Sequence, residues 1–328
     1  MERRFSNFLF LGLIISVLAI GGCKVGPDYK APEPNMPANW VGPAMAAESN
    51  LPAATERDIV NWWTTFGDAT MTSLVERAVK SNLDLKQAQA RILQARAARG
   101  IVAAGFWPEA SATGSATRSR PAVSADSPRA GAKRSLYEAG LDASWEMDIF
   151  GGVRRDIEAA EADIRAAVED QRDVLVTLTA EVALNYIDLR SFQQQIVIAQ
   201  NNLEAQKRTA ELTRRRFLGG FVGALDAANA DSQVATTASV IPLLESSARQ
   251  AIYNISVLLG QAPAAMLEEL SPFALIPPVP PSVPLGVPSD LLRRRPDIRG
   301  AEAQIHAARA RIGVATSDLF PKFFVSAA

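Results

Sequence analysis

Residues 137–152 read YEAGLDASWEMDIFGG, a stretch in which apolar or small residues alternate with polar ones from Tyr137 to Asp148. Successive side chains of a strand point to opposite faces, so this pattern predicts a strand with one apolar and one acidic face. The apolar face comprises Tyr137, Ala139, Leu141, Ala143, Trp145 and Met147. The other face comprises Glu138, Gly140, Asp142, Ser144, Glu146 and Asp148.

A long helix is expected directly after this strand. Gly151 and Gly152 end the strand, and neither Gly nor Pro recurs before Gly219. A continuous helix over those roughly 66 residues would be about 100 Å long, well beyond the usual helix length. Its apolar residues repeat every seven positions, which predicts helices packed side by side in a left-handed coil. That series is Val168, Leu175, Val182, Leu189, Ile196, Leu203, Ala210 and Phe217.

A companion apolar series is interrupted at two polar positions, Gln171 and Asn185, where register is expected to matter more than burial. Its members are Ile164, Leu178, Phe192 and Ala199. Further along, closely spaced glycines predict a tight turn, followed by a second helix that Pro242 should kink. The two helices form a hairpin with its tip at residues 217–225. The helices alone would also suit a cytosolic coiled coil, an alternative that the neighbouring strand disfavours.

The amino terminus, residues 1–22, is expected to be a signal peptide, because arginines precede a short apolar run at 8–20. The run leads into Gly21-Gly22-Cys23, which resembles the bacterial lipobox, so Cys23 is expected to carry lipid as the first mature residue. An ordinary signal peptide with an incidental cysteine is the alternative. Cys23 is the only cysteine, which excludes an internal disulfide. Lys24, where inner-membrane lipoproteins carry Asp, favours sorting to the outer membrane.

The regions between these features have their own signals. Residues 23–70 are rich in Pro, Asn and small residues and predict an extended, lipidated tether. A helical region follows at 71–104, then a strand hairpin at 106–150 whose first strand is signalled only weakly by alternating small residues at 111–119. Residues 261–289 are a proline-rich linker. The positions expected to be buried in the first helical region are Leu74, Val75, Ala78, Val79, Leu83, Leu85, Ile92 and Leu93.

After this linker the chain repeats itself at a constant offset of 213 residues. The matching pairs are Asp84/Asp297, Ala88/Ala301, Ala90/Ala303, Ile92/Ile305, Ala95/Ala308, Arg96/Arg309, Ala97/Ala310, Gly100/Gly313 and Pro108/Pro321. A first repeat is therefore expected at 71–260, ending in the long helical hairpin 151–260, and a second begins at 290–328. A complete second copy would end near residue 473, so roughly 145 residues are expected to be absent after Ala328, as in a C-terminally truncated form.

Nothing in the composition supports catalysis or nucleic-acid binding. The 328 residues carry a net charge of −1, and 48% of them are apolar. The only histidine, His306, is expected to be a packing or surface residue rather than a ligand. Metal-ligand spacing and phosphate-binding glycine loops are both missing, so neither a cofactor nor an enzyme activity is expected. The run of arginines at 214–216 suits a solvated helix end, or contact with an acidic partner.

The chemistry of the predicted strand is solvation. If the strand spans a bilayer, its apolar face meets lipid through Tyr137, Leu141 and Trp145, with Tyr137 and Trp145 as candidate interface residues. The acidic face would line water inside a barrel through Glu138, Asp142, Glu146 and Asp148. One hairpin cannot close a barrel, and hydrocarbon does not tolerate open strand edges. A duct built by an oligomer is therefore expected.

Four motifs resemble the outer membrane efflux factor family. They are Cys23 to Tyr29 (CKVGPDY), Trp62 to Asp68 (WWTTFGD), Trp145 to Gly151 (WEMDIFG) and Leu291 to Ile298 (LLRRRPDI). The resemblance covers the mature chain and is typical of TolC-like, NodT- and OprM-type outer membrane lipoproteins of tripartite RND efflux systems. It implies a mainly α fold with a membrane β-hairpin. Long antiparallel coiled-coil helices form an α-barrel, and three copies share a twelve-stranded outer-membrane β-barrel.

The resemblance also implies a function: a homotrimeric, passive exit duct for small toxic compounds and drugs. The implied location is the cell outer membrane, lipid-anchored and extending into the periplasm, with a periplasmic adaptor (membrane fusion) protein and an inner-membrane RND-type pump as partners. Cys23 is carried over as the site of lipid attachment. The residues carried over for adaptor docking are Phe217, Gly219, Gly220, Phe221, Val222, Gly223 and Leu225. A lipid-anchored periplasmic coiled-coil adaptor or envelope spacer is the alternative, which would leave the two-faced strand unexplained.

Overall fold

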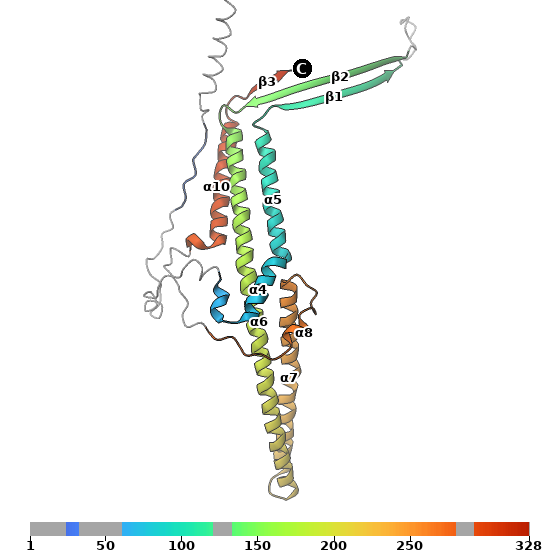
Figure 1. Cartoon of the computed structure of the whole chain (residues 1–328), viewed down its shortest axis with the longest axis vertical. Helices are drawn as coiled ribbons and strands as arrows, with labels where there is room; N and C mark the ends of the chain where they lie inside the picture. Colours follow the sequence, from blue (N-terminus) through green and yellow to red (C-terminus); the bar gives the residue numbers. More distant parts are fainter. Residues whose placement is uncertain (1–23, 33–60, 121–132, 280–291, 328) are drawn as a thin grey trace, which may run out of the picture. The chain divides into compact units, whose positions relative to one another are not determined.

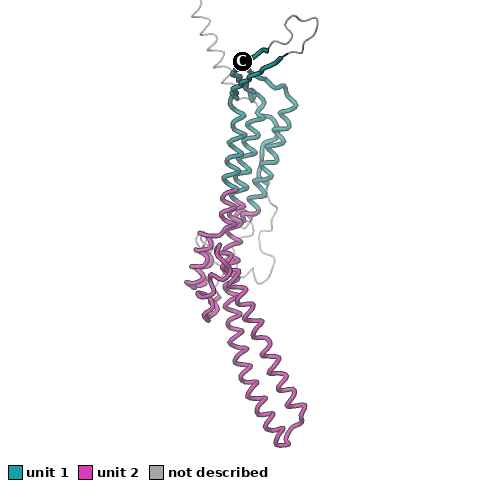
Figure 2. Tube along the Cα trace, turned by 90° about the vertical axis from the view of Figure 1, so that its right-hand side faces the viewer, with its two compact units in different colours: residues 1–34, 91–168, 298–328 teal, residues 35–90, 169–297 magenta. Residues whose placement is uncertain are grey.

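The computed structural model describes residues 24–32, 61–120, 133–279 and 292–327 (Figure 1). The chain divides into two compact units (Figure 2). One comprises residues 1–34, 91–168 and 298–328, and the other comprises 35–90 and 169–297. The division runs through α5 (Leu83–Ala104), α6 (Gly152–Leu218) and the start of α10 (Pro296–Ser317). One unit contains the strands, and the other contains the helical hairpin.

The first unit contains a three-stranded antiparallel sheet. Its strands are β1 (Glu109–Ser119), β2 (Arg134–Met147) and β3 (Phe323–Ala327), in the order β1-β2-β3. In the hairpin of β1 and β2, Glu109 lies opposite Ser144 and Ser119 opposite Arg134. β3 pairs with the other edge of β2, and helix α10 (Pro296–Ser317) precedes it. The strand predicted around residues 137–147 is therefore confirmed as the middle strand of the sheet.

The predicted long helix is also confirmed, since α6 runs without interruption over 67 residues. The second helix of the hairpin, α7 (Ala224–Leu258), follows after a short turn. It continues through Pro242, so the backbone donor that this proline lacks does not end the helix. Across the described ranges, no helix is both long enough and apolar enough to serve as a membrane span.

The core of the second unit lies where four helices meet. They are α4 (Ala69–Ser81), α6, α7 and the short α8 (Leu267–Leu270), and the 3-10 helix η1 (Trp62–Phe66) packs against them. Fully buried members of this core include Met71, Leu74, Val75, Ala78, Val182, Leu189, Ile255, Leu259 and Leu270. Removing apolar surface from water contributes about 25 cal/mol per Å², so this cluster is the main stabilising element of the unit.

The helical region expected from 71 to 104 is two helices rather than one, because Asn82 ends α4 and begins α5. Its backbone leaves the helical region, with a ψ of 138°. Its buried amide accepts a hydrogen bond from the Leu85 N–H (2.9 Å) and donates one to the Leu258 carbonyl (2.9 Å). Asparagine is among the strongest residues for capping a helix N-terminus, so the sequence carried this signal.

Burial along this region follows the prediction only in part. Leu74, Val75, Ala78, Leu85 and Ile92 are buried, and Val79 packs against the core. Leu83 and Leu93 were expected to be buried and are each 63% exposed. The helical period explains the difference: residues one or two positions apart lie on different faces, so burying Leu85 and Ile92 exposes the two leucines.

The interruption of the heptad series at Asn185 has a structural counterpart. The Asn185 side chain donates to the Glu181 carbonyl (2.8 Å) and accepts a hydrogen bond from Asn254 of α7 (3.0 Å). Val182 and Leu189, one turn on either side, are fully buried. An amide pair of this kind forms in one alignment of the two helices, which fits the role in register predicted for this position.

Candidate functional site

The register of the sheet gathers apolar side chains on one face. Tyr137 and Leu141 of β2 lie opposite Ala116 and Ala112 of β1. The same face continues onto β3 through the pairs Trp145/Val325 and Met147/Phe323. Directly opposite residues share a face, so the apolar surface extends over all three strands. Tyr137 and Leu141 are 79% and 77% exposed, which leaves this face open.

The other face of the sheet is mainly polar, although Phe324 of β3 lies on it opposite Glu146. Glu138 lies opposite Ser115, whose hydroxyl donates to the Glu138 carboxylate at 3.3 Å. Asp142 and Glu146 follow on the same face of β2 at steps of four residues. Lys322, just before β3, forms an ion pair with Glu146 at 3.8 Å. The acidic character is therefore strongest on the part of β2 that pairs with β1.

Asp148 does not belong to this strand face, contrary to the prediction. β2 ends at Met147. The Asp148 carboxylate accepts hydrogen bonds from the backbone N–H groups of Val153 (3.1 Å) and Arg154 (3.0 Å) at the start of α6. The Arg154 guanidinium also lies 3.1 Å from it. The alternation in the sequence runs one residue too far, because a carboxylate placed just before a helix satisfies its free N–H groups.

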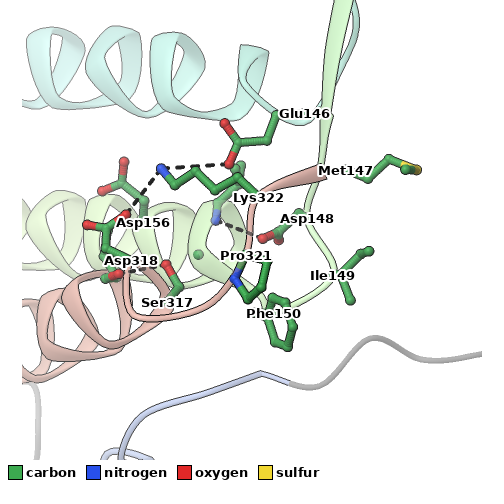
Figure 3. Close-up of a pocket in the computed structure, with 13 residues that line it drawn as sticks. Glu146, Met147, Asp148, Ile149, Phe150, Asp156, Ser317, Asp318, Pro321 and Lys322 are labelled. Atoms are coloured by element: carbon green, nitrogen blue, oxygen red, sulfur yellow. Dashed lines mark hydrogen bonds and ion pairs between the residues drawn. The ribbon is translucent and has the colours of Figure 1, made fainter. Parts of the chain in front are cut away.

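A small pocket lies where β2, α6 and α10 meet, with a volume of about 180 Å³ (Figure 3). The Lys322 ammonium reaches two of its acidic residues, Glu146 at 3.8 Å and Asp318 at 3.1 Å. Phe150 stacks on Phe320 with 4.6 Å between ring centroids. Drug-sized ligands occupy pockets of roughly 300–1,000 Å³, so this junction is a packed joint between strands and helices rather than a ligand site.

The turn between α6 and α7 forms the tip of the helical hairpin (Figure 1). Gly220 adopts the left-handed conformation, with a φ of +80°, which favours glycine. The Phe221 N–H then donates to the Arg216 carbonyl at 2.9 Å and closes the last turn of α6. On the other side, the Asp226 side chain accepts a hydrogen bond from the Gly223 N–H at 3.0 Å and caps α7.

Exposed apolar side chains cluster at this tip. Leu218, Phe221 and Leu225 are 78%, 81% and 72% exposed. The seven residues expected to contact an adaptor all lie in the turn or at the adjoining ends of α6 and α7. The tip therefore presents apolar surface on a backbone that is fixed by its own hydrogen bonds.

The arginine run beside the tip is largely engaged within the hairpin. Arg214 forms an ion pair with Asp231 of α7 at 2.7 Å, and Arg215 pairs with Glu211 on its own helix. Both pairs are exposed, and such pairs typically contribute only about 0–1 kcal/mol. The structure thus favours the solvated helix end over a free basic patch.

Cys23 lies outside the described residues, but the segment directly after it is held in place. Residues 24–29, which we call the strap, lie against α6 and α10, whereas the sequence predicts an extended tether. The centre of the contact is Arg155, whose side chain is 1% exposed. Its guanidinium donates to the Val25 carbonyl (2.9 Å), the Gly26 carbonyl (3.1 Å) and the Asp28 carboxylate (2.8 Å). An arginine on a long helix gives the same sequence signal whether it is solvated or buried, so the sequence did not predict this contact.

Three basic side chains surround the Glu158 carboxylate. It pairs with Lys24, with Arg155 at 2.9 Å and with His306 of α10 at 3.0 Å. Burial acts to raise the pKa of Glu158, but hydrogen bonds from Lys24, His306 and Arg155 outweigh it and bring the pKa down to about 2. The carboxylate is therefore ionised throughout the physiological range.

His306 has a packing role, as predicted. Its ring stacks on Tyr29 with 4.2 Å between centroids and an interplanar angle of 7°. The Tyr29 hydroxyl donates to Glu302 of α10 at 2.9 Å. At the offset of 213 residues His306 corresponds to Leu93, and this difference between the repeats was a sequence signal for the contact. Among the described residues, no group of three or more His, Cys, Asp or Glu side chains could hold a metal ion.

Several known proteins resemble this chain in sequence. Nodulation protein T of Rhizobium leguminosarum bv. trifolii is 34% identical over 309 residues, which cover 94% of this chain and 64% of that protein. Pyoverdine export outer membrane protein OpmQ of Pseudomonas aeruginosa is 34% identical over 324 residues, covering 97% of this chain and 66% of that protein. The chain thus spans just under two thirds of the length of these relatives.

Solved structures resemble it in fold. The outer-membrane channel OprN matches with a TM-score of 0.80 and 37% identity, covering 93% of this chain and 66% of that one. CusC, a protein described in terms of transmembrane channel formation, matches with a TM-score of 0.73 and 26% identity, again covering 93% and 66%. The expected TolC-like, mainly α fold class is confirmed by these neighbours.

A family model described as outer membrane efflux protein matches residues 74–261, more than half of the chain. The matched range contains the strand hairpin and the long helical hairpin whose geometry is given above. The chain belongs to the outer membrane efflux protein family.

Proposed function

We propose that this chain is a subunit of an outer membrane exit duct, which passes small toxic compounds out of the cell passively as part of a tripartite efflux system. The two-faced sheet is the observation that carries the proposal. One face exposes apolar side chains over three strands, and the other places Glu138, Asp142 and Glu146 in a row. Lipid on the first face and water on the second is the arrangement that lowers the free energy of both.

The duct is expected to be an oligomer, because one sheet of this width leaves strand edges that hydrocarbon does not tolerate. The resemblance to the efflux family implies that the oligomer is a homotrimer. β1 and β3 are the two edge strands of the sheet, and each has one unpaired edge among the described residues. Neighbouring strands from other copies, or from a completed second repeat, would satisfy these edges. The description of the relative OprN as an outer-membrane channel fits a duct in this membrane.

We further propose that residues 71–260 form the first structural repeat and that 290–328 begin the second, with 261–289 as the linker. At the offset of 213 residues, Ala104, the last residue of α5, corresponds to Ser317, the last residue of α10. β1 and β3 follow these two helices in the same way. The order of helix and strand thus supports the division that the sequence predicts.

Spin labels at Leu141 and Asp142 test the duct directly, because adjacent strand residues point to opposite faces. In the assembled protein, the label at Leu141 should be relaxed by oxygen dissolved in lipid, and the label at Asp142 by a water-soluble nickel chelate. Identical surroundings at both positions would remove the basis for a pore.

Protease access from outside intact cells to the loop between β1 and β2 gives a second test. A loop that is never reached would favour a periplasmic spacer.

The partners of the duct are proposed to be a periplasmic adaptor and an inner-membrane RND-type pump, with the hairpin tip as the adaptor's docking surface. Phe221 and Leu225 are the exposed apolar anchors of that tip. Replacing both with Ser should weaken adaptor binding roughly tenfold or more, since exposed aromatic anchors dominate such interfaces. The matched control is Leu212→Ser, an exposed leucine of α6 outside the tip. Equal loss of binding in both variants would place docking elsewhere.

Lipid attachment at Cys23 is proposed to anchor the mature chain to the outer membrane. Lys24, the residue after Cys23, is held by an ion pair with Glu158, so an anchor at Cys23 would be joined directly to the described part of the chain. Radiolabelled palmitate should be incorporated by the parent chain and not by Cys23→Ser. Incorporation that persists in this variant would exclude the site.

We also infer that the chain has no enzyme activity, in line with the efflux family to which it belongs.

A further inference from the structure

The strap is recognised by its backbone as well as by its side chains. Arg155 binds two consecutive carbonyls, those of Val25 and Gly26, and the Val25 N–H donates to the Phe150 carbonyl at 3.1 Å. Side-chain contacts add an ion pair at each end: Lys24 to Glu158, and Asp28 to Arg155. Such a set of contacts holds Lys24, Val25, Gly26 and Asp28 in place, which a loosely attached tether would not require.

Two glycines make this close approach possible. Gly26 has a φ of +88°, and a Cβ added there would lie 2.4 Å from the Cα of Gly313. A Cβ added to Gly313 would lie 2.8 Å from the Cδ and Cγ of Arg155. The equivalent glycine in the first repeat, Gly100, has nothing within 4 Å of such a Cβ among the described residues. The close approach that requires a glycine is therefore found at α10, where the strap lies, and not at the equivalent position of α5.

We infer that α6 and α10 form a binding site for the chain's own strap, and that the docked strap fixes the amino terminus at the strand-to-helix junction. Arg155 is the central donor, and Gly313 provides the space for it and for Gly26. The part that concerns a lipid anchor rests on the proposed acylation of Cys23. The docking itself does not, because it follows from the contacts of residues 24–29.

Docking places the anchor within narrow limits. Cys23 is one residue from Lys24, or about 3.8 Å between Cα atoms. Phe150, which binds the Val25 N–H, lies between the end of β2 and the start of α6. Lys24 and Val25, to which the proposed anchor is joined, are thus held beside the point at which the sheet gives way to helices. Since Tyr29 contacts Glu302 and His306 of α10, the strap also joins the first helix of the second repeat to α6.

Spin-label distances in the full chain test the docking. One label is attached at Lys30→Cys, directly after the strap, and the other at Ala315→Cys, an exposed position of α10. Ala315 lies roughly 20 Å along the helix from the level of Glu302, at 1.5 Å per residue. We expect one narrow distance distribution when labelled chains are diluted with unlabelled ones. A broad distribution in the parent chain would overturn the inference.

Gly313→Ala and Gly100→Ala are a matched pair of variants. Both place alanine at equivalent positions of equivalent helices, but only the first forces Arg155 out of its site. Gly313→Ala should broaden the distribution, and Gly100→Ala should leave it narrow. Gly26→Ala, which alters only the strap, should broaden it as well, so the test does not depend on a variant that could disturb α10. Narrow distributions in both Gly313→Ala and Gly26→Ala would contradict the assigned site.

The number of labels per chain separates docking from acylation. Cys23 is the only native cysteine, so a chain acylated there takes up two labels, and a chain with a free thiol takes up three. Two labels with a narrow distribution support both the strap and the anchor. Uptake of three labels would refute the proposed anchor. The distance distribution would then be measured after the additional Cys23→Ser change, and its width would still decide the docking.

Discussion

Arg155 bears an electrostatic cost in the strap site, because its buried guanidinium loses its hydration. Four of its five N–H donors are used, on two carbonyls and on the carboxylates of Asp28 and Glu158. Burial acts to lower the pKa of Arg155, and the hydrogen bonds to Asp28 and Glu158 outweigh it, so the pKa lies above its ordinary value. A buried charge matched in this way stabilises one arrangement, and it penalises the loss of any partner.

Glu158 should make the stability of the chain depend on acid pH. Its pKa falls from an ordinary 4.5 to about 2 in the folded chain. A lowered pKa means that the stabilisation is complete above about pH 4.5 and is lost as the pH falls toward 2. At neutral pH, Glu158→Gln should lower the free energy of unfolding by up to about 3 kcal/mol, from 1.36 kcal/mol per pKa unit.

Urea unfolding of the parent chain and of Glu158→Gln across pH 7 to 2 measures this effect. The difference between the two should shrink steadily below about pH 4.5. The control is Glu161→Gln, a half-exposed carboxylate on the same helix that pairs with Arg99. Its effect should stay below about 1 kcal/mol at neutral pH. A difference for Glu158→Gln that is independent of pH would contradict the assignment.

Asp148 should contribute to stability as a helix cap rather than as a pore-lining residue. Replacing it with Ala removes the acceptor for two backbone N–H groups of α6 and the partner of the Arg154 guanidinium. The expected loss is about 1–2 kcal/mol of unfolding free energy. The comparison is Asp163→Ala, which removes an exposed carboxylate of α6 that pairs with Arg311 of α10, and it should cost less. Equal losses in thermal unfolding would mean that capping is not the role of Asp148.

Among the secondary-structure elements, α6 and α7 depend on each other for their alignment. Val182 and Leu189 repeat at seven residues and supply burial, but equally spaced apolar residues would also allow the helices to slide by one repeat. The hydrogen bond between Asn185 and Asn254 has no equivalent partner after such a shift. Burial thus supplies most of the stability, and the amide pair supplies the register.

A double-mutant cycle on Asn185 and Asn254 measures this coupling. Each single change to Ala should cost about 0.5–1.5 kcal/mol, since a half-exposed amide left alone can bind water. The two changes together should cost less than the sum, with a coupling of about 0.5–1 kcal/mol. A cycle between Asn185 and Gln250, which bonds Asn254 from the same helix, provides the comparison. Strict additivity for the first pair would show that the hydrogen bond does not form in solution.

Within the whole molecule, the acidic face of the sheet should set the ionic preference of the proposed duct. Glu138, Asp142 and Glu146 repeat on one face, and among the described residues only Glu146 forms an ion pair with a lysine. A row of carboxylates beside water raises the local concentration of cations. The outer part of the duct should therefore favour cations, and Glu138 and Asp142 should contribute most because Lys322 offsets Glu146.

Reversal potentials across a planar bilayer measure this preference in the assembled protein. In a potassium chloride gradient, Glu138→Gln together with Asp142→Asn should reduce the preference for potassium roughly twofold or more, with the effect weakening as salt rises. Leu141→Val, on the apolar face of the same strand, should leave it unchanged. A preference that is equal in the parent and the acidic-face variant would place the selective region outside this sheet.

The regular elements could be inferred from the sequence because each rests on a local period. Alternation over residues 137–147 specifies a strand, and a run without Gly or Pro after Gly152 specifies α6. The hairpin tip followed from its glycines, and Gly220 does adopt the backbone that requires glycine. Errors arose where a local pattern had two readings. Asp148 continues the alternation yet caps a helix, and Asn82 sits within an apolar period yet ends α4.

The strap site could not be inferred in this way, because its parts come from three separate regions of the chain. Arg155, His306 and residues 24–29 carry no common period, and their roles depend on α10 lying beside α6. Local patterns fix φ and ψ preferences and the faces of helices and strands, so composition and period were enough for the elements, and the four motifs were enough for the family resemblance. Which buried charge meets which carbonyl is set by the packing of distant segments, and that information exists only in the folded chain.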